Sequence, residues 1–157
     1  MPAGATYEPI ATASPTSGTS YTFSSISGAY TDLVLSISAF MSGGTTLRLK
    51  MNGATSYQYQ ITDSQGNVQR SANNANIVLL DNNGTSITTI LINIMNYSAT
   101  TLNQKCVVGY GGAYNQSVVV SGALTTTSAI SSVEILTTNG QTFASGTTLT
   151  LYGIARA

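Results

Sequence analysis

Apolar and polar residues alternate with a period of two along most of this chain, and this pattern constrains its fold more than any other feature. Leu33, Leu35 and Ile37 share one face of an extended segment, whereas the serines between them point to the other face. The same alternation recurs in 47–51 and 57–61, after turn signals at Ser42-Gly43-Gly44 and Asn52-Gly53. The sequence therefore predicts consecutive strands, each buried on one face.

The rest of the chain continues this pattern. Further strands are expected at 77–80, 87–97, 103–110, 116–123, 130–138 and 147–155. In 87–97, Ile90 and Ile92 lie on one face and Leu91 and Met95 on the other, which predicts a central strand covered on both sides. A helix at 123–132 stays open, although Thr and Ser give it poor propensity. Nine or ten short strands predict an all-β fold, a single antiparallel β-sandwich of the jelly-roll type over 20–157.

Two segments lack the alternation. Residues 1–19 contain three prolines among small polar residues and predict an extended N-terminal arm, in which Tyr7 and Ile10 need a surface to pack on. That surface is either the chain's own sheet or a neighbouring subunit. The polar stretch 63–75 predicts a long loop.

Charge is scarce in this chain of 157 residues. Charged residues make up 6% of the sequence, and the formal net charge is zero, which excludes a basic face for nucleic acid. The chain has no histidine and one cysteine, so it cannot build a Cys/His zinc cluster, a thiol–imidazole pair or a disulfide framework alone. We expect no catalytic residue, no cofactor and no metal site. We also expect no membrane span, and synthesis in the cytoplasm, since no signal peptide is recognisable.

The acidic residues are isolated from one another in sequence. They are Glu8, Asp32, Asp63, Asp81 and Glu134. A glycosidase needs two facing carboxylates, and nothing in the spacing predicts such a pair, although a hydrolase acting through Glu134 or Asp63 stays as an alternative. Calcium at the loops of Asp63 or Asp81 is a second alternative, but each loop has a single acid.

Tyrosines are the candidate contact residues. Tyr57 and Tyr59 lie two apart on one strand face, where they either pack in the core or present rings to a ligand. Tyr110 and Tyr114 flank a glycine-containing turn that presents two rings. With Tyr7 and Ile10, these four residues form the predicted partner-contact set. Cys106 is expected to behave as a small buried hydrophobe.

Several strings of the chain resemble a group of small virion proteins of tailed bacteriophages, common in phages of aquatic and cyanobacterial hosts. The strings are Tyr7-Glu8-Pro9-Ile10-Ala11-Thr12, Thr22-Phe23-Ser24-Ser25-Ile26, Tyr30-Thr31-Asp32-Leu33, Asn52-Gly53, Asn96-Tyr97-Ser98, Ala129-Ile130-Ser131-Ser132-Val133 and, most specifically, 143–154. None of them is a catalytic motif. The resemblance covers most of the chain.

The resemblance implies a structural and non-enzymatic role. It implies a jelly-roll capsid decoration (cement) protein on the capsid exterior, a homotrimer that binds the major capsid protein and bridges neighbouring capsomers. The alternative is a receptor-binding or glycan-binding module of the phage tail, for which a host-surface glycan would be the ligand. Low charge fits either, because few repulsive charges oppose ordered association.

Overall fold

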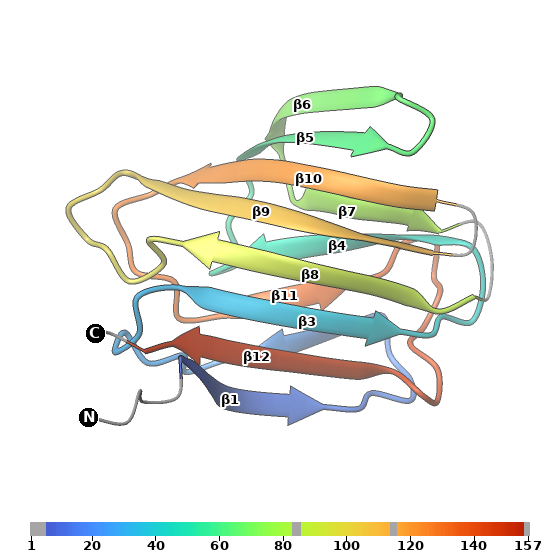
Figure 1. Cartoon of the computed structure of the whole chain (residues 1–157), viewed down its shortest axis with the longest axis horizontal. Helices are drawn as coiled ribbons and strands as arrows, with labels where there is room; N and C mark the ends of the chain where they lie inside the picture. The colour runs from blue at the N-terminus through green and yellow to red at the C-terminus, as the bar shows by residue number, and fades with distance from the viewer. Residues whose placement is uncertain (1–5, 83–85, 114–115, 156–157) are drawn as a thin grey trace.

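The computed structural model describes residues 6–82, 86–113 and 116–155. All regular secondary structure in these ranges is β-strand, and they contain no helix. The described part contains 12 strands (Figure 1). They are β1 (Tyr7–Ala13), β2 (Ser20–Phe23), β3 (Leu33–Ala39), β4 (Thr45–Met51), β5 (Tyr57–Asp63), β6 (Val68–Asn74), β7 (Ile77–Asn82), β8 (Thr88–Met95), β9 (Gln104–Ala113), β10 (Gln116–Thr125), β11 (Val133–Leu136) and β12 (Thr148–Ile154).

The strands form two sheets of unequal size. The large sheet has eight strands in the order β1-β12-β3-β8-β9-β10-β5-β6, and the small sheet has four in the order β2-β11-β4-β7. All pairings between named strands are antiparallel. Figure 1 shows the large sheet in front of the small one. The predicted all-β antiparallel sandwich is confirmed.

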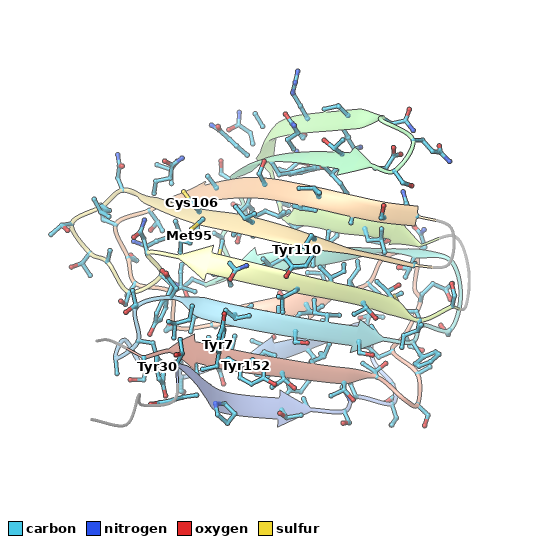
Figure 2. All side chains as sticks on the ribbon, in the orientation of Figure 1. Tyr7, Tyr30, Met95, Cys106, Tyr110 and Tyr152 are labelled. Carbon is cyan, nitrogen blue, oxygen red and sulfur yellow. The ribbon has the colours of Figure 1, made fainter. Side chains whose placement is uncertain are left out.

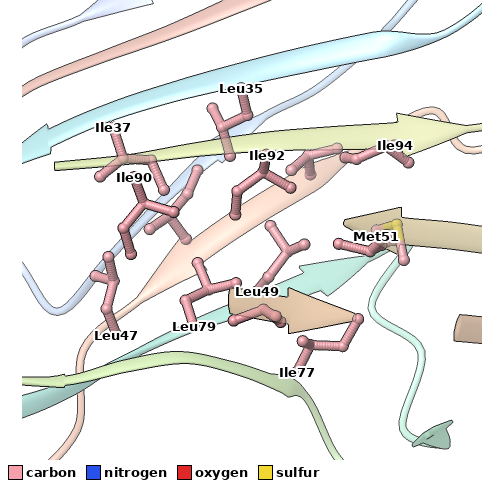
Figure 3. Close-up of a cluster of buried hydrophobic side chains, with 14 of the residues drawn as sticks. Leu35, Ile37, Leu47, Leu49, Met51, Ile77, Leu79, Ile90, Ile92 and Ile94 are labelled. Atoms are coloured by element: carbon pink, nitrogen blue, oxygen red, sulfur yellow. The ribbon is translucent and has the colours of Figure 1, made fainter. Parts of the chain in front are cut away.

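The core lies between the two sheets, where the inward side chains of the alternating strands meet (Figure 3). Its centre consists of Leu35 and Ile37 of β3, Ile90, Ile92 and Ile94 of β8, Leu47, Leu49 and Met51 of β4, and Ile77 and Leu79 of β7. These side chains are almost completely removed from water. The period-two pattern therefore found the right inward face on the central strands.

One local prediction is wrong, and one open alternative is not realised. The stretch 63–75 is not a loop throughout, because Val68–Asn74 forms β6, an edge strand paired only with β5. Its side chains are mostly exposed, so it is held by backbone hydrogen bonds and shows no apolar period. No helix forms at 123–132: β10 continues to Thr125, and the residues after it are irregular.

The prediction that β8 is covered on both sides is also wrong for the single chain. Its inward residues Ile90, Ile92 and Ile94 are buried, whereas Leu91 and Met95 point away from the small sheet and are half-buried. β8 is central, since it pairs with β3 and β9, but nothing in the described chain covers its outer side.

Part of the predicted N-terminal arm lies along the chain's own large sheet. Tyr7–Ala13 forms β1, which pairs with β12 and is the edge of that sheet. The register shifts between Pro9 and Ala11. Proline has no backbone N–H, and a bulge twists an edge, so β1 is a poor template for a further strand.

Candidate interaction surfaces

The large sheet has one face on the core and one face open. We call the open one, turned away from the small sheet, the outer face; Figure 2 looks onto it, with Tyr110 labelled near its middle. Three of its apolar side chains stand side by side on neighbouring strands, because Leu91 pairs with Tyr110 and Tyr110 pairs with Val119. We call these three residues the outer row.

The outer row is well exposed. The exposed fraction is 55% for Tyr110 and 58% for Val119, and Leu91 is half-buried between its neighbours. Val108, two residues before Tyr110 on β9, is 39% exposed on the same face. The row extends across Thr62 to Val68, which is 49% exposed. Contiguous apolar surface of this kind on a folded protein marks an interaction site.

Charged side chains avoid the middle of the outer face. On the six strands from β12 to β5, the charged residues are Lys105 and Asp63. Lys105 points inward and is fully buried, and its Nζ donates to the carbonyl oxygens of Ala99 and Leu102. Asp63 lies at the last position of β5, in the turn to β6. The interior of the outer face is therefore uncharged.

A shallow groove lies at one end of the large sheet, where β10, β5 and β6 meet. Its volume is about 540 Å³, and it is lined by Gln58, Tyr59, Gln60, Arg70, Ser71, Ala72, Ser121, Gly122 and Ala123. Arg70 Nε donates to Gln60 Oε1 over 2.7 Å, which orients the guanidinium at the rim. Amide, hydroxyl and guanidinium groups beside two alanines suit a polar ligand with hydroxyl or carboxylate groups.

Two residues of the predicted contact set, Tyr7 and Tyr110, lie on the large sheet's surface, but they are not brought together. Tyr7 on β1 and Tyr110 on β9 are each 55% exposed, and four strand-to-strand steps separate them. The Tyr7 ring packs edge-on against Tyr152, with ring centroids 6.4 Å apart (Figure 2). Ile10 is half-buried and packs against the core.

Tyr57 and Tyr59 are not available to a partner. Tyr57 is fully buried and Tyr59 is 8% exposed, because both share the inward face of β5 with Ile61. The Tyr57 hydroxyl accepts a hydrogen bond from the Met51 N–H over 2.7 Å and donates to the Met51 carbonyl over 3.0 Å. Of the two interpretations of this pair, the structure shows packing in the core. Tyr114 lies outside the described residues.

Sequence reasoning missed Leu91, Val108 and Val119 as surface residues. A signal for them existed, since the runs Val107-Val108 and Val118-Val119-Val120 place apolar residues on both faces of a strand. Cys106 also differs from its expectation, because it is half-buried on the outer face. It lies directly opposite Met95 on β8 (Figure 2).

The described carboxylates have structural surroundings. Asp63 accepts hydrogen bonds from the backbone N–H groups of Gln65 and Asn67 and from the Asn67 amide, which together lower the pKa of its carboxyl, the Asn67 side chain most. Asp32 accepts from the Asn96 N–H over 2.9 Å. Glu134 is on β11 in the small sheet, and the side chain of Asp81 lies outside the described residues. Within the described residues, no three His, Cys, Asp or Glu side chains gather into a metal site.

The comparisons with known proteins add nothing to the geometry. No protein-family model matches the chain, and no curated protein or solved structure is significantly similar to it. In the part of the chain that the structure describes, no helix has the length and apolar character needed to cross a membrane.

Proposed function

We propose that this chain is a structural, non-enzymatic virion protein that decorates the exterior of a capsid and stabilises the shell by bridging neighbouring capsomers. The observation that carries the proposal is the exposed surface of the large sheet, which has an uncharged outer face with an apolar row, suited to self-association, and an exposed aromatic edge at β1, suited to contact with a shell. Such a surface has its effect through association with another protein surface, because its contribution grows with the area removed from water. The resemblance to small phage virion proteins supplies the kind of assembly.

We infer that the sandwich is a jelly roll. Successive strands support this, because β2, β4, β7 and β11 belong to the small sheet and the strands between them to the large one. The chain thus wraps repeatedly from one sheet to the other, as in double-sheet jelly rolls. In this interpretation the meander β8–β9–β10 replaces a single strand of the large sheet.

The major capsid protein is the partner that we propose for the β1 edge and the N-terminal segment 1–19. Tyr7 is the exposed ring at this edge, and Tyr152 supports it from β12. An exposed ring braced by a second ring loses little conformational entropy on binding, which favours it as a contact. The chain is also proposed to associate with itself, so that many modest contacts act together.

A separation of ionisable groups supports the non-enzymatic part of the proposal. Glu134 is on the small sheet, whereas Asp63 lies in a turn of the large sheet and its oxygens accept three hydrogen bonds. A pair of carboxylates that acts as acid and base has to face one another across a substrate. These two residues belong to different sheets.

Rebinding to capsids stripped of this protein tests the proposal. We expect the wild-type chain to rebind in hundreds of copies per particle and to raise the temperature at which particles break open. Tyr7→Ser should weaken binding about tenfold, as loss of an interface aromatic commonly does. The matched control is Leu102→Ser, which removes a 50% exposed apolar side chain from the loop between β8 and β9. Failure of the wild-type chain to rebind would contradict the role on the shell. Equal binding by the Tyr7→Ser variant would contradict the contact through β1.

A second candidate function, a glycan-binding module of a phage tail, is favoured by the groove at β10, β5 and β6. Its amide, hydroxyl and guanidinium groups can hydrogen-bond sugar hydroxyls and a carboxylate. Copy number separates the two functions, since about a dozen copies per particle indicate a tail and hundreds a shell. Chemical-shift changes at Gln60 and Arg70 on addition of an acidic oligosaccharide would support the second candidate.

A further inference from the structure

The outer row is the most exposed apolar surface of the large sheet and has no partner within the described chain. Val119 and Tyr110 are more than half exposed, and Val108 adds to the same surface. Scattered exposed hydrophobic side chains are ordinary on proteins, but these lie in register on adjacent strands. A row in register forms one continuous apolar strip, which is the arrangement found where two proteins meet.

The sequence of β8 points to the same surface independently. Its apolar residues on both faces are typical of a strand that is covered on both sides. The small sheet covers the side with Ile90 and Ile92, and the outer side with Leu91 is left open. The described residues supply no cover for that side, so the cover has to come from outside them.

The charge distribution indicates what the cover is. When a surface packs against a copy of itself about a two-fold axis, a charge near the axis approaches the same charge of the copy, and like charges close together oppose binding. The six strands from β12 to β5 carry no charged side chain within the outer face, since Lys105 is buried beneath the sheet and Asp63 lies at its end. Arg70 stands at the β6 edge. Packing of this face on itself meets no repulsion at its centre.

The size of the face is sufficient. Eight strands of about eight residues, spaced about 4.8 Å apart with about 3.4 Å per residue, cover roughly 1,000 Å². A stable protein interface buries about 800 Å² on each partner. The outer face therefore has the area of a complete interface, with the outer row inside it.

We propose that the occupant of the outer face is a second copy of this chain, packed outer face against outer face, with Leu91, Tyr110 and Val119 at the centre of the contact. The inference rests on the proposed function in one respect, that the chain works in an assembly. Its test uses the purified chain alone, so that either proposal can fail without the other.

Sedimentation velocity over a concentration series tests the inference. We expect the wild-type chain to associate at about micromolar concentration, and Val119→Lys to weaken association at least tenfold by placing charge on the strip. Thr22→Lys is the matched control, because it adds the same charge at an exposed position of β2 on the small sheet and should leave association unchanged. Val119 is more than half exposed, so the variant folds, and circular dichroism verifies this.

Cross-linking locates the contact. In a Cys106→Ser background, Val119→Cys should give covalent dimers with a short bismaleimide, and Thr22→Cys should not. A wild-type chain that stays monomeric at about 100 μM overturns the inference, because an interface of this size associates below that concentration. Association that Val119→Lys leaves unchanged also overturns it. Loss of capsid binding by Val119→Lys in a monomeric chain would assign the face to the capsid protein instead.

Discussion

The two outward-facing surfaces of the sandwich are built on the same core but differ in charge. On the small sheet, Arg48 and Lys50 of β4 point away from the core, and Glu134 of β11 lies directly opposite Lys50. On the large sheet, the equivalent positions of the central strands carry no charge; they are Ser, Thr, Asn, Gln, Leu, Val, Met, Cys, Tyr and Gly. Alternation is equally regular in both, so the inward pattern sets the fold and the outward residues set what each surface can bind.

This difference separates two tasks. Surface charge opposes unwanted association, and the chain concentrates its few charges on the small sheet, on edges and in turns. The uncharged outer face of the large sheet is thereby left for a specific partner. A chain with 6% charged residues keeps both properties only if the charges are segregated in this way.

The largest expected effect is a difference in the free energy of unfolding between substitutions on the inward side and on the outward side of β8. Ile92 is fully buried between the sheets, and its neighbour Leu91 belongs to the outer row. Ile92→Ala should lower the free energy of unfolding by about 2–5 kcal/mol, because it leaves a cavity in the core. Leu91→Ala should cost less than about 1 kcal/mol in the monomer. Chemical denaturation of dilute protein measures both.

Equal losses at the two positions would break the comparison, since they would mean that the outer row is part of the core of one chain. Ile92→Val is the control for gentle truncation, with an expected cost of about 0.5–1.5 kcal/mol. Repeating the Leu91→Ala measurement at high protein concentration should increase its cost, because association then adds to stability.

The next effect concerns the contact that joins the two sheets. The Tyr57 hydroxyl, on β5 of the large sheet, makes two hydrogen bonds with the Met51 backbone on β4 of the small sheet. Tyr57→Phe removes both, and because the Met51 carbonyl still accepts from the Ala54 N–H, the loss falls mainly on the Met51 N–H, at a cost of about 1–3 kcal/mol. Tyr59→Phe is the matched control on the same strand and should cost less.

Alkaline pH sharpens this prediction. Burial raises the pKa of the Tyr57 hydroxyl above its ordinary 10.0; the hydrogen bond with Met51 opposes the rise, and the charge of Glu134 adds to it. A group whose pKa is higher in the folded chain than in the unfolded chain contributes fully to folding stability at pH values below its unfolded pKa. That contribution is lost as the pH rises through the folded pKa. The stability difference between wild type and Tyr57→Phe should therefore shrink above pH 10.0. A stability difference that stays constant as the pH rises would contradict this prediction.

Strands with a buried apolar face were predictable from the sequence. A strand that is held mainly by backbone pairing was not. Alternation located β3, β4 and β5, whose inward residues all enter the core. β6 was not predicted because five of its seven residues are polar and its two apolar residues, Val68 and Ala72, show no period of two. It forms after the turn at Gly66, whose φ is +81°, through hydrogen bonds to β5. Such a strand leaves no period in the sequence.

The candidate surface was less predictable than the fold. Tyr110 was found from its type, but the outer row depends on β9 lying between β8 and β10 in a fixed register. Pairing partners and register are long-range properties that one strand's sequence does not contain. The same limit explains Tyr57 and Tyr59: their alternation with Gln58 and Gln60 marked a common face, and only the packing of β5 against β7 and β4 made it the buried one.

A smaller effect tests the charged surface of the small sheet. Glu134 faces Lys50 directly across β11 and β4, and Thr22 across β11 and β2. Glu134→Lys places like charges opposite each other and should lower the free energy of unfolding by about 0.2–1 kcal/mol, a loss that salt reduces. Glu134→Gln is the control for loss of charge without repulsion. Neither variant should change association through the outer face; if Glu134→Lys dissociates the oligomer, the two surfaces are not independent.

The smallest expected effect lies at the rim of the large sheet. The pKa of the Asp63 carboxyl lies below its ordinary 3.8, chiefly because the Asn67 side chain and two backbone N–H groups donate to it. A group whose pKa is lowered by folding contributes to folding stability at pH values above its unfolded pKa. That contribution is lost as the pH falls through the folded pKa. The turn between β5 and β6 should therefore loosen below pH 3.8, seen as lower protection factors of the Gln65 and Asn67 amides once the pH dependence of the intrinsic exchange rate is removed. Asp63→Ala should show this loosening at neutral pH, while amides on β8, far from the turn, stay protected. If amides on β8 lose protection to the same extent in acid, then the charge of Asp63 stabilises the whole large sheet. That result would contradict the separation of an uncharged outer face from a charged border.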